Sequence, residues 1–70
     1  MAQHGKATDE DVVKAIERMT KKEGYPPTVS ELSQDLGVVK SAVQYHLDRL
    51  RSVGIVTSER GKPRTLRVVL

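Results

Sequence analysis

Residues 28–54 read TVSELSQDLGVVKSAVQYHLDRLRSVG, and this stretch decides the fold of the chain. Thr28 and Glu31 form a T-x-x-E capping box, which predicts the start of a helix, and Gly37 is suited to end it. A second helix is expected from about Lys40 to Arg51, closed by Gly54. Two helices joined by three or four residues must cross at a steep angle, so the stretch predicts a helix-turn-helix.

Apolar residues recur at helical spacing in both helices and predict their buried faces. Leu32 and Leu36 lie four positions apart in the first helix. The second helix carries a longer apolar stripe, which we expect to be buried against the first. Its members are Val43, Leu47 and Leu50, with Val53 beyond them.

Upstream of this motif, another amphipathic helix is predicted over Asp9–Glu23. Thr8 can cap it and Gly24 can end it, while Val12, Val13, Ile16 and Met19 form its apolar stripe. Residues 1–7 lack periodicity and predict a flexible N-terminal arm. Tyr25-Pro26-Pro27 forms a stiff connector, which could add a short edge strand at Pro27–Val29.

Downstream, the pattern changes to that of a β-hairpin. Ile55–Thr57 predicts a strand, Glu59–Lys62 a turn, and Thr65–Leu70 a returning strand with Leu66 and Val68 on its buried face. The expected fold class is therefore α+β, mainly α, in which three helices precede a C-terminal hairpin. One winged helix-turn-helix domain is predicted over residues 8–70.

The composition narrows the possible functions. The 70 residues include no Cys, which rules out disulfides and thiolate metal sites, and no Phe or Trp. Residues 1–37 carry five basic and seven acidic side chains, whereas residues 38–70 carry seven basic and two acidic. A net charge of −2 in the first part and +5 in the second predicts contact with a polyanion, against the alternative of an ordinary solvated surface.

The absence of a signal peptide or a long apolar run predicts a cytoplasmic, nucleoid-associated protein without membrane contact.

The second helix of the motif has a polar face that can read DNA bases. Lys40 can reach guanine or a phosphate, and Gln44 can pair with adenine through two hydrogen bonds. Ser41 suits a base or the backbone, and Tyr45 can offer its hydroxyl to a phosphate or its ring edge to a thymine methyl. Solvent exposure alone is the alternative for each. Asp48 would repel phosphate, so we expect an ion pair or a weak cytosine contact there.

The hairpin turn, ERGKPR at residues 59–64, adds three basic side chains beside this helix. Such a turn can follow phosphates or enter a minor groove, although a solvated charged turn is the alternative. Arg49 and Thr28 are also candidates for backbone contact. The complete set of predicted DNA contacts is Lys40, Ser41, Gln44, Tyr45, Arg49, Thr28, Arg60, Lys62 and Arg64.

The two histidines do not suggest an enzyme. His4 falls in the predicted arm, and His46 leans toward the core side of its helix, between Val43 and Leu50. A packed, hydrogen-bonded histidine is favoured there over a phosphate contact, and a metal ligand is the least favoured. No catalytic triad, P-loop, cofactor site or metal site is expected. Binding of single-stranded nucleic acid is disfavoured, because Tyr25 and Tyr45 are the only Tyr, Phe or Trp residues on which bases could stack.

The run GYPPTVSELSQDLGVVKSAVQYHLDRLRSVGIV resembles the DNA-binding domain of the LexA repressor family. The resemblance rests on the G-x-P-P-T connector and covers about Asp9 to Leu70. The later pattern V-x-x-H-L-x-x-L-x-x-x-G is similar to winged helix-turn-helix regulators in general. This likeness implies a winged helix-turn-helix that binds double-stranded DNA as a repressor-like transcriptional regulator.

The sequence also departs from that family. LexA repressors carry a self-cleaving, dimerising Ser-Lys domain, and the chain is expected to stop before it. Val39 stands where Ser or Thr would often cap the next helix, and Ser33 replaces a usual Ala.

Two further expectations concern partners. A module of this size would bind a half-site weakly, so we expect paired binding as a homodimer or with a partner protein. The alternative function is a protein–protein adaptor, which would use the same helix or hairpin. The mostly polar and basic character of that face favours DNA.

Overall fold

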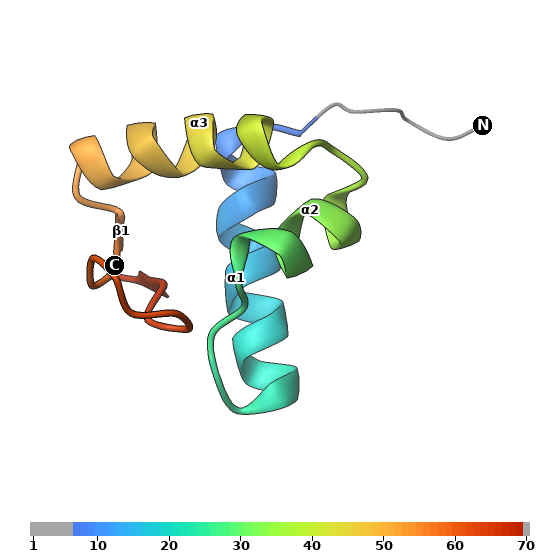
Figure 1. The fold of residues 1–70 in the computed structure, drawn as a ribbon, viewed down its shortest axis with the longest axis vertical. Helices are drawn as coiled ribbons and strands as arrows, with labels where there is room; N and C mark the ends of the chain where they lie inside the picture. The colour runs from blue at the N-terminus through green and yellow to red at the C-terminus, as the bar shows by residue number, and fades with distance from the viewer. Residues whose placement is uncertain (1–6, 70) are drawn as a thin grey trace.

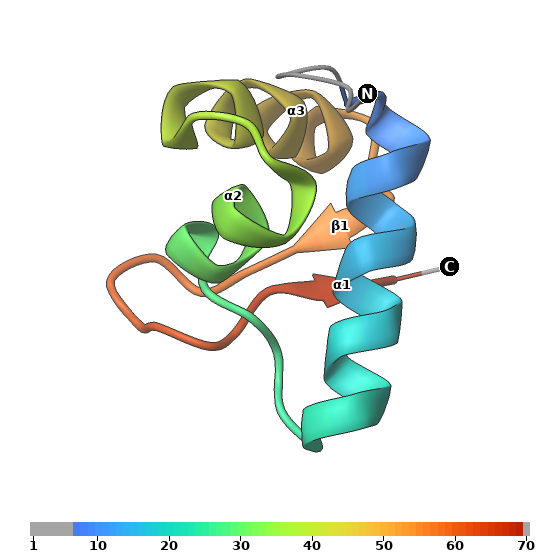
Figure 2. The same ribbon diagram turned by 90° about the vertical axis from the view of Figure 1, so that its right-hand side faces the viewer.

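The computed structural model describes residues 7–69, so the predicted arm at residues 1–7 lies almost wholly outside the described part of the chain. Within that part, the order of elements is α1 (Asp9–Glu23), α2 (Val29–Leu36), α3 (Lys40–Ser52), β1 (Val56–Thr57) and β2 (Arg67–Val68). The three helices pack against one another, and the hairpin packs against α1 and α3 (Figures 1 and 2). The predicted fold class, a winged helix-turn-helix, is confirmed.

Local capping sets the ends of α1 and α2, as the sequence predicted. The Thr8 hydroxyl accepts the Asp11 N–H at 3.1 Å, and the Asp11 carboxylate accepts the Thr8 N–H at 3.0 Å. Thr28 and Glu31 form the same reciprocal pair at 3.1 and 3.0 Å. Because each box satisfies N–H groups that the first helical turn leaves unbonded, both helices begin at a defined residue.

The remaining helix ends also follow local signals. Gly24 and Gly37 adopt the left-handed conformation after α1 and α2. The Val39 side chain makes no capping hydrogen bond within residues 7–69, so α3 lacks the side-chain cap that Ser or Thr would supply at this position.

The core lies where the three helices meet and continues under the hairpin. The predicted stripes are buried or partly buried, with one exception. Val53 is 69 % exposed, so its prediction as a core residue is wrong. Gly54, with a φ of 84°, turns the chain after α3 and brings Ile55 and Val56 onto the core instead. The buried apolar residues are Val12, Ala15, Ile16, Leu32, Val38, Val43, Leu47, Leu50, Val56 and Leu66.

The hairpin is shorter than predicted. β1 and β2 pair antiparallel through Val56↔Val68 and Thr57↔Arg67, and the Val69 N–H donates to the Ile55 carbonyl at 2.7 Å. The intervening residues form a loop closed by Thr65, whose hydroxyl accepts the Glu59 N–H at 2.8 Å. Residue 70, the predicted end of the second strand, lies outside the described residues.

No strand forms at Pro27–Val29, so that expectation is wrong. Thr28 is committed to the cap, and Val29 is already the first residue of α2. Within residues 7–69, no helix combines the length and apolar character that crossing a membrane requires.

Candidate nucleic-acid interface

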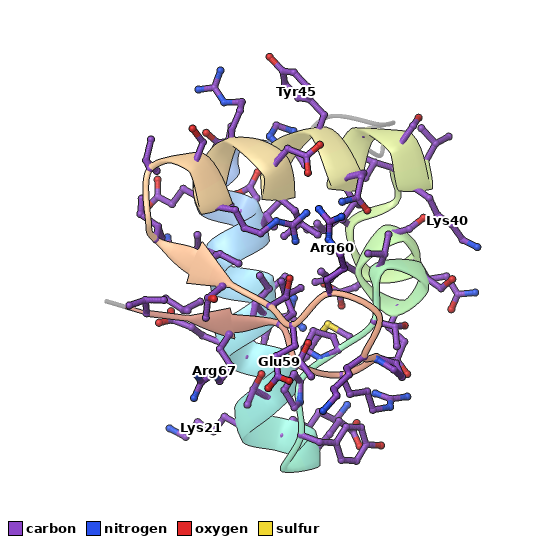
Figure 3. The ribbon with its side chains drawn as sticks, turned by 60° about the vertical axis from the view of Figure 1, so that its left-hand side comes forward. Lys21, Lys40, Tyr45, Glu59, Arg60 and Arg67 are labelled. Carbon is purple, nitrogen blue, oxygen red and sulfur yellow. The ribbon has the colours of Figure 1, made fainter. Side chains whose placement is uncertain are left out.

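The N-terminal half of α3 presents a polar face to solvent. Because Val43, Leu47 and Leu50 turn one side of α3 into the core, Lys40, Ser41 and Gln44 are left exposed. Tyr45 is 60 % exposed. In Figure 3, Lys40 projects outward from the start of α3 and Tyr45 points away from the hairpin. All four predicted base-reading residues are therefore exposed, but Tyr45 lies on a flank of the helix that faces away from the hairpin.

The first turn of α1 fixes the orientation of α3. His46 Nδ1 lies 2.6 Å from Asp9 Oδ1, and Arg49 Nε donates to Asp9 Oδ2 at 3.2 Å. The His46 side chain is only 17 % exposed, so the prediction of a packed, hydrogen-bonded histidine is confirmed. The hydrogen bond with His46 and the charge of Arg49 hold the pKa of Asp9 below its usual value.

Arg49 thus has a structural partner as well as an exposed position. More than half of its side chain is exposed, and its guanidinium carbon lies 5.8 Å from the centre of the Tyr45 ring. The pair occupies the flank of α3 that faces the start of α1.

Asp48 links the polar face of α3 to the start of the hairpin. It accepts a hydrogen bond from Arg51 at 2.9 Å and a longer one from Gln44 at 3.4 Å. Arg51 also donates to the Ser58 hydroxyl at 2.9 Å. The predicted ion pair of Asp48 is confirmed, and it partly offsets the negative charge that Asp48 would present to a phosphate.

The hairpin loop faces α3 across a groove. Arg60 extends from the loop toward α3 (Figure 3), and it has no ion pair within the described residues. Lys62 has only a long, exposed contact of 3.6 Å with Glu59. The groove is lined by residues of both walls, among them Gln44, Leu47, Arg51, Glu59, Lys62 and Arg64. Lys62 and Gln44 of α3 therefore line one groove, and Arg60 extends toward the same helix.

Arg64 lies differently from the other two basic residues of the hairpin. Its guanidinium donates to both carboxylate oxygens of Glu31, at 3.0 and 2.9 Å, and to the Pro26 carbonyl at 3.1 Å. It also lies 4.6 Å from the centre of the Tyr25 ring. The hydrogen bonds to Glu31 raise the pKa of Arg64, and the same contact lowers that of Glu31. The structure thus turns Arg64 toward α2, away from the group that Arg60 and Lys62 form.

Thr28 is also used structurally, since its hydroxyl accepts the Glu31 N–H in the capping box. Its own hydroxyl proton is left to donate to an external acceptor.

Several residues that shape this surface were missed by sequence reasoning. Asp9 was predicted only as the first residue of a helix, and Arg51 and Ser58 were assigned no role. The Arg18–Asp35 pair, with contacts of 3.2 and 2.5 Å, joins α1 to α2 and was not predicted either. Such contacts between distant residues leave no local spacing pattern. Among residues 7–69, no three His, Cys, Asp or Glu side chains lie close enough to hold a metal ion.

A helix-turn-helix whose second helix exposes a polar face beside a basic β-hairpin defines the class of winged helix-turn-helix domains. Within that class, the chain belongs to the LexA DNA-binding domain family, whose model matches residues 6–65.

Curated relatives agree with this assignment. The LexA repressor of Thermotoga neapolitana is 36 % identical over 62 residues, which cover 89 % of this chain and 32 % of that protein. The LexA repressors of Bacillus licheniformis and Bacillus subtilis (strain 168) are each 33 % identical over 60 residues, covering 84 % of this chain and 29 % of theirs. The chain spans about a third of the length of the curated relatives it matches.

Proposed function

We propose that this domain binds double-stranded DNA sequence-specifically and serves a repressor-like transcriptional regulator. The N-terminal half of α3 enters the major groove, and the hairpin follows the adjacent backbone or minor groove. The observation that carries the proposal is a shared orientation. The start of α3, the start of α2 and the tip of the hairpin loop all lie on the side of the molecule away from α1 (Figure 2).

The chemistry of the α3 face supports base reading. Lys40 contacts guanine or a phosphate, Ser41 a base or the backbone, and Gln44 an adenine. The 3.4 Å bond from Gln44 to Asp48 is long, so the amide can exchange it for two bonds to a base. Gln44→Ala is expected to relax base preference at one position by about 1–3 kcal/mol, measured by competition between duplexes that differ at single base pairs.

Backbone contacts flank this face. Tyr45 and Arg49 offer a hydroxyl and a cation on the side of α3 near α1, and Thr28 offers its hydroxyl proton at the start of α2. On the flank of α3 away from Tyr45, Arg60 and Lys62 neutralise phosphates from the hairpin. Contacts of this kind hold the protein in register on the duplex while the bases determine specificity.

The test compares two pairs of basic residues. Fluorescence anisotropy measures the affinity for a duplex at several salt concentrations, for the wild type, Arg60→Ala/Lys62→Ala and Lys21→Ala/Lys22→Ala. Both double variants remove two positive charges, but Lys21 lies far from Lys40 and Arg60, near the end of α1 (Figure 3). Each phosphate contact adds about 0.9 to the slope of log affinity against log salt. The hairpin variant should therefore lower that slope by about 1.8, and the α1 variant should change it little.

Three results would refute the proposal. Salt-independent binding, or no binding to any duplex, would exclude it and leave protein docking as the alternative. An equal slope change in both double variants would show that only net charge matters.

We also propose that two copies, or one copy and a partner protein, occupy adjacent half-sites. A single small module buries limited DNA surface, so pairing supplies the missing affinity. Analytical ultracentrifugation with a duplex of two half-sites should find two domains per duplex. A tight complex of strict 1:1 stoichiometry would contradict this.

A further inference from the structure

Arg64 connects three segments that are separate in the sequence. Its guanidinium reaches Glu31 in the first turn of α2, the Pro26 carbonyl in the connector, and the face of the Tyr25 ring. The two hydrogen bonds to Glu31 are parallel and nearly equal in length, which is the strongest geometry available to an arginine and a carboxylate. No other residue of the hairpin loop among those described makes an ion pair with a helix.

The backbone of Arg64 indicates that this contact is imposed by the fold. Its φ of 59° is left-handed, and Arg64 is the only residue other than glycine with a positive φ in the described part of the chain. An L-residue adopts that conformation only where surrounding contacts compensate for it. The residue in this conformation is also the one whose guanidinium contacts Glu31 of α2.

The receiving site is itself rigid. Pro26 and Pro27 restrict the connector, and the capping box fixes Glu31, whose Oε1 also accepts the Thr28 N–H at 3.0 Å. Glu31 therefore performs two tasks with one carboxylate. It accepts the Thr28 N–H at the start of α2, and through Arg64 it holds the hairpin loop close to α2.

We propose that Arg64 and Glu31 form a latch that positions the hairpin loop for DNA, so that Arg64 is a positioning residue and not a phosphate contact. The inference rests on the proposed function, since it assigns the hairpin to the DNA backbone. Because α2 and α3 pack directly on each other, a loop fixed to α2 is also fixed relative to the reading face of α3. Arg60 and Lys62 then meet the phosphates without first having to be ordered.

The direction in which Glu31→Gln changes DNA affinity distinguishes a positioning role of Arg64 from a phosphate contact. Glu31→Gln removes a negative charge from the DNA-facing side, so electrostatics alone would raise affinity. The latch predicts the opposite, a loss of about 3- to 10-fold, because the loop is no longer held. Glutamine retains the capping box, so α2 should still begin at Val29. The matched control is Glu59→Gln, which removes an equal charge from the partner of Lys62 and should leave affinity unchanged or slightly higher.

A double-mutant cycle provides the second arm. Arg64→Gln and Glu31→Gln should each weaken duplex binding to a similar extent, and the double variant should bind no more weakly than either. If Arg64 contacts phosphate instead, Arg64→Gln lowers the salt slope by about 0.9 and Glu31→Gln does not weaken binding. That pattern would overturn the latch.

A third readout is independent of DNA. In ¹⁵N relaxation measurements, the heteronuclear NOE of the amides at residues 59–62 should fall in both variants, while that of α1 stays unchanged. A general loss of stability would lower the heteronuclear NOE in α1 as well, so a decrease confined to residues 59–62 points to the latch. If Arg64→Gln does not fold, Glu31→Gln and Glu59→Gln still decide the question. Unchanged loop dynamics in a folded Glu31→Gln would refute the latch, and failure of the wild type to bind any duplex would refute only the proposed function.

Discussion

Gly37 forms the corner between α2 and α3, and its replacement by alanine has a calculable cost. The residue has a φ of 71° and a ψ of 29°, and its N–H donates to the Ser33 carbonyl at 2.9 Å. A Cβ placed there would meet no atom of the described residues within 4 Å. The penalty is therefore that of the left-handed backbone alone, about 1–2 kcal/mol, without an added clash.

Thermal unfolding followed by far-ultraviolet circular dichroism measures this loss. A change of 1 kcal/mol lowers the Tm of a domain of this size by about 4–8 °C, so Gly37→Ala should lower it by roughly that amount or somewhat more. Gly37→Asn should lose less, because asparagine tolerates the left-handed region better than alanine.

Gly24→Ala is the matched control. Gly24 ends α1 with a φ of 85° and is equally open, so its replacement should cost about the same 1–2 kcal/mol. A Gly37→Ala variant as stable as the wild type would show that the corner is not held left-handed. A loss above about 3 kcal/mol, far beyond that of the control, would reveal a steric conflict and refute the reasoning.

Three further predictions concern the turn, the core and acid stability. Ser33→Ala removes the hydroxyl that donates to the Val38 carbonyl at 2.6 Å and should cost about 1 kcal/mol in urea denaturation, whereas unchanged stability would show that water replaces the bond. Leu47→Ala should cost about 2–5 kcal/mol, because the side chain is 1 % exposed and little can move to fill the cavity. The variant should be largely unfolded at 37 °C by circular dichroism, and a native spectrum with an unchanged Tm would contradict this. The hydrogen bond to Arg64 lowers the pKa of Glu31 in the folded state. The ionised Glu31 therefore contributes its full stabilisation of the fold above its ordinary pKa of 4.5, and this contribution is lost as pH falls through the lowered pKa of the folded state. Wild-type Tm should therefore fall below pH 4.5 more steeply than that of Glu31→Gln, and parallel curves would argue against the pair.

The helical part of the fold was predictable because its signals are local. Each capping box joins residues three positions apart, and each closing glycine acts on the last turn of its own helix. Apolar spacing then identified the buried faces of all three helices within the described residues. Val53 was the exception, because helical periodicity was extended past the point where Gly54 redirects the chain.

The residues of the candidate site could be predicted from the sequence, but the contacts that their side chains make could not. The polar residues of α3 were identified because they lie opposite a regular apolar stripe. Arg60, Lys62 and Arg64 were equivalent in the sequence, since all three are basic side chains of one turn.

By itself the sequence determined the order of elements, the helix boundaries and the reading face of α3, because these depend on interactions within about one helical turn. Only the tertiary structure decided how the charged side chains are used. Arg64 meets Glu31 across 33 positions, and His46 meets Asp9 across 37. Whether a basic side chain faces a phosphate or a carboxylate depends on which helix the chain brings beside it, and that is settled by packing in three dimensions.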